Sequence, residues 1–479
     1  MALARWSAPA FVAAYILISF SATPNPMSAL WRPLLVGVLA ALALQLLLWL
    51  ALRDGDLASI GAAVVVLVLG AAWVPLAVLV VAVVWIVVVQ SMRRRKGQPA
   101  LGLSRRAVAR NLGIFAWAFA VVAAVPVVGW GITSSRPAAA RAEVPDTVPP
   151  DILVLLVDAY PRADSLTEQF GMDNSTFVAD LTSRGFKVAA QSRSNYTATW
   201  ASLSSMFYGR YVEEIPDLTP APADPAEQYR RVMLALAEAP VLDGLRAKGY
   251  EIVTVPSPFE SAELTSADRI LKPPEWSSFE LSLIQHSLAG QLAFGLAPSI
   301  AFDQHRARLA STLQLLGDEM ARASSTPRFV FAHLLLPHAP VVFTADGSPV
   351  QGPACFPGCN IYGMTSEADW AAFPAQVEHA NELVLAVVDR IVGEDPEAIL
   401  IVMSDHGSPR TGAAPINAFR NLFAARVPGG EVTYEDDITP MTVLARLTDL
   451  PYTSGDPYRG WFSAGLEPLT LTPYSGPDP

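Results

Sequence analysis

The stretch DILVLLVDAY, residues 151–160, contains a continuous apolar run of strand length, and an acidic residue, Asp158, follows that run. Apolar residues without alternation are typical of a strand buried on both faces of a parallel sheet. A helix over 175–184 and a strand over 186–192 are predicted next. The apolar pattern recurs, with helical stretches between, in EIVTVPS (251–257), RFVFAHLLLP (328–337) and AILIVMSDHG (398–407). The sequence therefore predicts an α/β domain whose mostly parallel sheet has helices on both faces.

The first part of the chain is too apolar for an ordinary soluble protein. Hydrophobic residues make up 52% of the chain, and its mean hydropathy is +0.34. Uncharged apolar runs, each about long enough with its flanks to cross a hydrocarbon layer of roughly 30 Å, occupy 9–22, 34–52, 57–73, 75–89 and 112–132. We expect five transmembrane helices. Four is the alternative, because only a short turn separates the third and fourth runs, and a cleaved signal peptide is the alternative for the first.

Charge is divided unevenly along the chain. Residues 1–131 hold ten Lys or Arg and two acidic residues, although the whole chain has a net charge of −11. The segment 91–110 carries seven basic residues and no acid, which places it in the cytoplasm by the positive-inside rule. We therefore expect a multi-pass cell-membrane protein whose C-terminal domain is extracytoplasmic. The acidic remainder excludes a nucleic-acid partner, because phosphate backbones are bound by clustered Lys and Arg.

This topology sets the expected domain boundaries and the state of the two cysteines. Cys355 and Cys359 could close a small disulfide outside the cytoplasm, and two unpaired thiols are the alternative. A tetrahedral metal site at these cysteines would lack its other ligands nearby. The expected parts are a membrane domain over 1–133, a linker rich in Ala and Pro over 134–150, an extracytoplasmic domain over 151–465 and a tail over 466–479.

Polar side chains gather where the predicted strands end. Asp158 ends the first strand. His333 lies in the strand over 328–337 and His338 follows it, and Asp405 with His406 ends the last strand. Each alone could be a cap, a turn or a core residue. Together they reach the sheet edge at which α/β proteins bind ligands. Carboxylates and an imidazole can hold Zn²⁺, Mn²⁺ or Mg²⁺, and such an ion activates a hydroxyl to attack an ester phosphorus or sulfur.

The hydroxyl that such an ion would activate is expected in SNYTATWASLSSMFYG, residues 194–209, which contains eight hydroxyl side chains. We interpret this stretch as a turn that leads from a strand into a helix. A nucleophile at a helix start is favoured, because the backbone N–H groups there attract an anionic phosphoryl group. Spacing alone does not decide which hydroxyl it is.

These segments together resemble the alkaline phosphatase/sulfatase superfamily, and more closely its membrane-anchored branch, which includes lipoteichoic acid synthases and phosphoethanolamine transferases. The resemblance covers about residues 150–450 and implies an alkaline-phosphatase-like fold. It also implies a sulfatase-like hydrolase or transferase. The matching stretches, in family order, are DILVLLVDAYPRADSL (151–166), SNYTATWASLSSMFYG (194–209), FVFAHLLLPHAPVVF (329–343) and IVMSDHG (401–407).

The resemblance assigns the nucleophile to Thr199. In sulfatases a nucleophilic Cys or Ser is followed by Ser three residues later and by Gly ten residues later. Here Ser202 and Gly209 follow Thr199 at that spacing, and threonine is the nucleophile of the transferase branch. Threonine cannot become the formylglycine of true sulfatases, so phosphoester chemistry is favoured over sulfate ester cleavage. Thr197 is the alternative nucleophile.

The remaining site residues follow from the same resemblance. It makes Asp158, Thr199, Asp405 and His406 the metal ligands, and His338 the histidine that contacts the transferred group or protonates the leaving oxygen. His333 is the second choice, and Asn195 could contact substrate. Where the family has a further acid, this chain has Ala159, so one divalent ion is expected.

The leading hypothesis is a metal-dependent enzyme that acts on cell-envelope lipids or glycans beside the membrane. Hydrolysis and transfer remain open, because the outcome depends on whether water or an acceptor reaches the covalent intermediate. A non-catalytic envelope protein that keeps the fold for binding or assembly is the alternative from another class. Arg162 and Asp164, near the first strand, are expected to be a helix cap and its ion-pair partner rather than site residues.

Overall fold

The computed structural model forms two compact units, which are described separately. Unit 1 comprises Met1–Ser135, Trp276–Pro298 and Ala354–Cys359, and unit 2 comprises Arg136–Glu275, Ser299–Pro353 and Asn360–Pro479. The residues that the structure describes are 6–22, 27–69, 104–134, 148–219, 224–259, 262–297, 299–350, 367–408, 413–429, 434–453, 459–463 and 471–475. Cys355, Cys359 and residues 135–147 of the predicted linker (134–150) lie outside them, so the disulfide and the domain boundaries remain predictions.

Unit 1 consists of apolar helices. Two stretches, Met27–Leu52 and Arg106–Gly131, are long and apolar enough to cross a membrane, while α1 and α3 are shorter apolar helices. The fourth predicted run, 75–89, lies outside the described residues. The described helices are α1 (Ser7–Ala22), the 3-10 turn η2 (Met27–Ala29), α2 (Trp31–Leu52), α3 (Gly55–Leu69), α5 (Arg105–Ser134), α11 (Ser278–His286) and α12 (Leu288–Leu296).

The order of contacts shows the directions of these helices. Phe11 shares an apolar cluster with Ala116, and Phe20 shares another with Val127, so α1 and α5 run parallel. The start of α2 packs near the end of α1, and its later part packs near the start of α1, so these two run antiparallel. The start of α1 bonds to the first part of α3, and Phe11 clusters with its last part, so α3 is parallel to α1.

Unit 2 contains a seven-stranded sheet in the order β2-β7-β6-β1-β5-β3-β4. Strands β6, β1, β5, β3 and β4 are parallel, whereas β7 is antiparallel to β6 and β2 is antiparallel to β7. The expected mostly parallel sheet is thus confirmed. The strands are β1 (Ile152–Val157), β2 (Lys187–Val188), β3 (Glu251–Val255), β4 (Arg269–Ile270), β5 (Arg328–Leu334), β6 (Ile399–Met403) and β7 (Phe423–Arg426).

One predicted strand is much shorter than expected. The stretch 186–192 forms only the two-residue β2, because the chain then turns toward the loop before β7. There Arg193 makes an isolated bridge with Arg420. The predicted helix over 175–184 is confirmed as α7, which ends one residue earlier.

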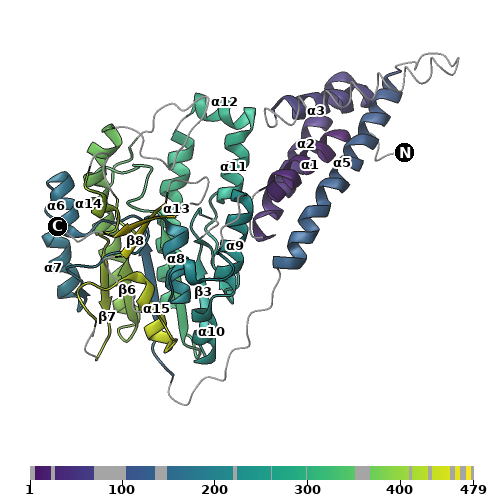
Figure 1. Ribbon diagram of the computed structural model, residues 1–479. Coiled ribbons are helices and arrows are strands. Elements are labelled where there is room, and N and C mark those ends of the chain that lie inside the picture. Colours follow the sequence, from purple (N-terminus) through teal and green to yellow (C-terminus); the bar gives the residue numbers. More distant parts are fainter. Residues whose placement is uncertain are drawn as a thin grey trace. The chain divides into compact units, whose positions relative to one another are not determined.

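Helices cover both faces of the sheet (Figure 1). On one face, Ile152, Val154 and Leu156 of β1 pack in the core that also includes Leu203 and Phe207 of α8. The alternate β1 side chains point to the other face, where α13 packs on β5 and on α14. The helices and remaining strands are α6 (Ala163–Phe170), α7 (Ser175–Ser183), α8 (Thr199–Tyr208), η3 (Val212–Glu214), α9 (Pro225–Ala237), α10 (Pro240–Ala247), α13 (Ser299–Ala321), α14 (Glu367–Glu394), η5 (Pro415–Ala418), α15 (Pro440–Thr448), β8 (Arg459–Ser463) and β9 (Leu471–Ser475).

Candidate active site and metal centre

The register of the central strands brings two predicted ligands to one level of the sheet edge. Strands β1 and β6 pair as far as Leu156 and Met403, so Asp158 and Asp405 each lie two residues beyond that pair. Both carboxylates are buried. The turn after β1 joins them further, because the Ala159 N–H donates a hydrogen bond to Asp405 Oδ1 at 3.1 Å. Parallel pairing, rather than sequence proximity, creates this pair.

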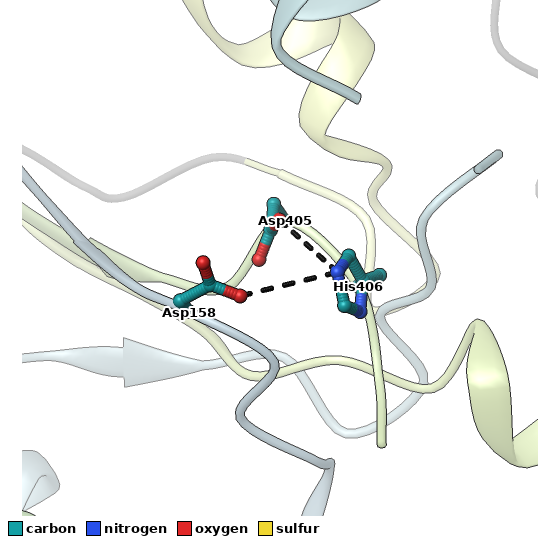
Figure 2. A group of neighbouring side chains, drawn as sticks. All are labelled: Asp158, Asp405 and His406. Carbon is teal, nitrogen blue, oxygen red and sulfur yellow. Dashed lines mark ion pairs between the residues drawn. The ribbon is translucent and has the colours of Figure 1, made fainter. Parts of the chain in front are cut away.

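Asp158, Asp405 and His406 form a compact cluster at this edge (Figure 2). One ligand atom from each lies within 4.8 Å of the others. His406 Nε2 is 3.3 Å from Asp405 Oδ2 and 3.9 Å from Asp158 Oδ1. Ligand atoms bound to a single ion at about 2.1 Å lie about 3–4 Å apart. The spacing therefore fits one divalent cation.

Hydrogen bonds fix the ring of His406 in the orientation that a metal ligand needs. Its Nδ1 lies 2.7 Å from Gly407 O and donates a hydrogen bond to it. Nε2 therefore carries the lone pair that faces the carboxylates. Burial lowers the pKa of His406, but the charges of Asp405 and Asp158 outweigh it and raise this pKa overall. A proton and a cation would therefore compete for the Nε2 lone pair.

Two buried oxygens of the cluster are unsatisfied. Asp158 Oδ1 and Asp405 Oδ2 have no hydrogen-bond partner among the residues that the structure describes. Burying a carboxylate oxygen without a partner is costly, and native proteins rarely leave one so. A cation at the cluster would satisfy both atoms. Two carboxylate oxygens and one imidazole nitrogen suit Zn²⁺ or Mn²⁺ and are compatible with Mg²⁺.

His333 is buried and contacts the cluster through a hydrogen bond to Asp158. The side chain is buried, and its Nε2 donates to Asp158 Oδ2 at 2.8 Å. Burial raises the pKa of Asp158, but the charge of His338, the hydrogen bond from His333 and the charge of His406 outweigh it and lower this pKa to about 2. Asp158 is thus ionised at neutral pH, as a metal ligand must be.

His338 lies on a loop that one buried amide organises. Its backbone N–H donates to Asp158 O at 3.2 Å, and its half-buried ring donates from Nδ1 to Ala339 O at 2.8 Å. The Gln376 side chain of α14 bonds five backbone groups of this loop. Its Nε2 donates to the carbonyls of residues 337, 338 and 340, and its Oε1 accepts from the N–H groups of residues 342 and 343.

Helix α8 begins at Thr199, the expected nucleophile, which is half-buried. Its N-cap, Ala198, provides no side-chain hydrogen bond, so no cap side chain bonds the first backbone N–H groups, although the Ala201 N–H donates to Ala198 O at 3.1 Å. Within the described part of the chain, no hydrogen bond joins Thr199 to the cluster. Five other hydroxyls of 194–209 bond to protein groups: Ser194 and Ser202 to Tyr196 O, Tyr196 to Glu213, Ser204 to Trp200 O, and Tyr208 to Ala235 O.

The segment before Thr199 is attached to the Asp405 turn through one amide. Ser192 Oγ donates to Asn421 Oδ1 at 3.0 Å, and Asn421 Nδ2 donates to Ser404 O at 2.5 Å. All three side chains are buried, as is that of Asn195. This chain of bonds connects the approach to α8 with the residue that precedes Asp405.

Gly407, which ends the SDHG motif, is required for close packing. A Cβ there would lie 2.2 Å from Asn417 O and 2.6 Å from Arg420 O. Its N–H donates to Ala418 O at 2.9 Å. Backbone crowding therefore excludes a side chain at this position.

Sequence reasoning did not identify Gln376, Asn421 or Ser404 as part of the site. Ser404 accepts the Tyr160 N–H at 2.8 Å and donates to His406 O at 2.7 Å, so it joins the two turns that carry the ligands. Its position beside Asp405 was the one available signal. Arg162 is the N-cap residue of α6 and is paired with Asp164 at 2.7 Å, as predicted.

Known proteins were compared with the chain. No family model and no curated protein matches it. Solved structures do match. The C-terminal periplasmic domain of EcEptC from Escherichia coli, also solved in complex with Zn, has a TM-score of 0.41 and 13% identity, over 70% of this chain and 96% of that chain.

Two further matches carry names of the classes that the sequence motifs resemble. The integral membrane protein lipooligosaccharide phosphoethanolamine transferase A from Neisseria meningitidis has a TM-score of 0.36 and 10% identity, over 69% of this chain and 64% of that chain. The lipoteichoic acid synthase LtaP from Listeria monocytogenes has a TM-score of 0.40 and 12% identity, over 66% and 77%. These scores are below 0.5, so the functional case rests on the residues of this chain.

Proposed function

We propose that this chain is a membrane-anchored, metal-dependent enzyme that cleaves or transfers phosphate esters of cell-envelope lipids or glycans through a covalent intermediate on Thr199. The observation that carries the proposal is the buried cluster of Asp158, Asp405 and His406 with two unsatisfied carboxylate oxygens. A binding or scaffold protein has no need of such a cluster. The apolar helices of unit 1 support action at a membrane.

Each site residue has a distinct role in this proposal. Asp158, Asp405 and His406, together with Thr199, hold one divalent ion. That ion would act as a Lewis acid that lowers the pKa of the Thr199 hydroxyl and neutralises the transferred group. His333 positions Asp158 through the 2.8 Å hydrogen bond, a role that replaces the substrate contact expected from the motif.

The proposed reaction has two steps. First, Thr199 Oγ forms a bond to phosphorus, the bond from phosphorus to the leaving oxygen breaks, and His338 gives that oxygen a proton. The Thr199 proton passes to solvent. Second, water or an acceptor hydroxyl attacks phosphorus, its proton passes to His338, and Thr199 Oγ leaves and is protonated again. In this proposal, N–H groups at the start of α8 and the Asn195 side chain bind the phosphoryl oxygens.

The decisive experiment measures turnover of an aryl phosphodiester and of a phosphodiester lipid by the full chain in detergent. Zn²⁺, Mn²⁺ or Mg²⁺ is added to one sample and a chelator to another. We expect Thr199→Ala to reduce turnover by about a thousandfold or more, because the nucleophile is removed. Mass spectrometry of the digested protein after a quench should find the transferred group on the peptide that contains Thr199.

Thr197→Ala is the matched control, because it removes the neighbouring hydroxyl. Loss of turnover in Thr197→Ala alone would move the nucleophile to Thr197. Equal turnover of wild type and Thr199→Ala would refute the covalent mechanism. Absence both of turnover and of bound metal by elemental analysis would favour the non-catalytic envelope protein. The product separates the two reactions: a free phosphate monoester indicates hydrolysis, and a modified acceptor indicates transfer.

A further inference from the structure

Helix α12 presents an apolar stripe on its exposed face. Its sequence LAGQLAFGL contains no charged residue. Ala289, Leu292, Ala293 and Leu296 are exposed, and their i, i+3, i+4 and i+7 spacing places them on one side of the helix. Leu292 is 43% and Leu296 is 87% exposed. A helix on the surface of a water-soluble domain normally has polar residues on this side.

The hairpin of α11 and α12 belongs to unit 1, far from the rest of that unit in sequence. The Phe279 ring of α11 meets Phe20 of α1 edge to face, with centroids 5.3 Å apart. Phe279 also shares an apolar cluster with Leu30 and Val127. Helix α12 contacts α3. The chain leaves unit 2 after Glu275, adds this hairpin to the apolar helices, and returns to unit 2 at Ser299.

The charge on α11 is neutralised where the hairpin meets the helices. Arg32, at the start of α2, donates from Nε and from Nη2 to the Glu280 carboxylate. Glu280 also closes a capping box with Ser277, whose N–H donates to Glu280 Oε2 at 2.8 Å. A paired, capped carboxylate costs less to bring near lipid than a free one.

The hairpin contacts the helix ends that the positive-inside rule places outside. Phe20 lies near the end of α1, Arg32 at the start of α2 and Val127 in the last third of α5. Helix α5 begins within the basic segment 91–110, which the rule places in the cytoplasm. Since α1, α3 and α5 run parallel, the end of α3 lies at this same end of the bundle.

We propose that α12 is an interfacial membrane helix whose stripe of Ala289, Leu292, Ala293 and Leu296 is covered by lipid acyl chains of the outer leaflet. The inference rests on the proposed membrane topology and not on the proposed chemistry. The argument for lipid is continuity, because the stripe belongs to the same unit as α2 and α5, which also expose Leu and Val side chains. The chain would thereby be attached to the membrane through α12 as well as through the apolar helices α1, α2, α3 and α5.

The test places a nitroxide spin label at Leu296→Cys in the full chain, with Cys355→Ser and Cys359→Ser to remove the native thiols. The protein is reconstituted in vesicles of phosphatidylethanolamine and phosphatidylglycerol. Oxygen concentrates in lipid, and a polar nickel chelate concentrates in water. We expect the ratio of oxygen to nickel collisions at Leu296→Cys to be several-fold above that at Ser324→Cys, which is exposed on unit 2.

Val125→Cys, exposed on α5, is the control for lipid, and its ratio should be at least as high as that of Leu296→Cys. A Leu296→Cys ratio equal to that of Ser324→Cys would overturn the proposal by showing a water-exposed stripe. A label that neither reagent reaches would also overturn it, because a protein partner or second copy would then cover the stripe. Since Leu296 is exposed, the substitution leaves the packing of the hairpin intact, and enzyme activity is not part of the measurement.

Discussion

His333 shows how one buried side chain acts on the site through another residue. Its Nε2 donates to Asp158 Oδ2 at 2.8 Å, and the ring is buried. Outer hydrogen bonds of this kind orient a ligand carboxylate and raise metal affinity. The motif alone could not distinguish this role from a substrate contact, because both place the histidine at the end of the same strand.

The first prediction follows from that hydrogen bond. We expect His333→Leu, which removes the donor, to weaken binding of the divalent ion by about 10- to 100-fold. His333→Gln can place an N–H near the position of Nε2 and should keep more of the affinity. Calorimetric titration of the chelator-treated protein with Zn²⁺ or Mn²⁺ measures both. Equal weakening in the two variants, or none in either, would contradict the positioning role.

Gln376 supports the second prediction. Its amide bonds five backbone groups of the loop that carries His338. Replacing it by Ala leaves several buried groups unpaired, at roughly 1–3 kcal/mol for each that water does not reach. We expect Gln376→Ala to lower the thermal unfolding midpoint and, in the protein that remains folded, to reduce kcat.

A matched variant separates these effects. Gln376→Glu keeps the acceptor for the N–H groups of residues 342 and 343 but loses both donors, so it should be intermediate in stability and in kcat. If both variants match the wild type in kcat, the amide does not position His338.

At the scale of elements, the end of α8 explains the glycine that the family motif marks ten residues after Thr199. Gly209 is the C-cap, with φ of +62°, and a Cβ there would lie 2.8 Å from Ala445 Cβ of α15. Helix α8 and α15 pack on the same face of the sheet. The motif spacing therefore reflects helix length and packing as well as chemistry.

The third prediction compares two helix ends with nearly the same backbone. Gly209→Ala meets both the left-handed φ and the clash with α15, whereas Gly171→Ala meets only the φ of +65°, because nothing lies within 4 Å of its added Cβ. We expect a loss of about 1–2 kcal/mol for Gly171→Ala and about 1–3 kcal/mol more for Gly209→Ala. Denaturant unfolding measures the difference, and equal losses would show that α15 moves aside without cost.

At the scale of the molecule, a buried ion-pair network joins α13 to the edge of the sheet. Glu319 pairs with Arg269 at 2.7 Å, with Arg322 at 2.8 Å and with Arg328 at 3.3 Å. Burial raises the pKa of Glu319, but its hydrogen bonds from Arg269 and Arg322 outweigh this and lower the pKa to about 2. Glu319 itself is buried, so its charge depends on these three partners.

The fourth prediction is the pH dependence that this network causes. The folded-state pKa of Glu319 lies below its ordinary value, so its stabilisation is fully present above about pH 5 and is lost as the pH falls toward 2. The shift in pKa corresponds to at most about 3 kcal/mol, and solvent screening at the partly exposed Arg269 and Arg322 makes the contribution smaller. Glu319→Gln should be less stable than the wild type at pH 7 and should show a smaller loss of unfolding free energy between pH 5 and pH 3. An identical acid dependence in the two proteins would assign the loss to other carboxylates.

The sequence by itself determined the elements of the sheet and the residues at its edge. Strands β1, β3, β5 and β6 are read directly from apolar runs, because a strand buried on both faces has that composition wherever it lies in the fold. Parallel strands end at a common edge, so Asp158, Asp405 and His406 could be expected together before any geometry was known. Motif spacing likewise pointed to Thr199 at the start of a helix.

Only the tertiary structure decided how those residues are supported. Gln376 and Asn421 act on loops that are distant in sequence, and a buried amide has no local pattern that reveals its partners. The same is true of residues 276–298, whose place in unit 1 depends on contacts with helices more than a hundred residues earlier. Local sequence reports whether a side chain will be buried, whereas the choice of partner depends on which surfaces the whole chain brings together.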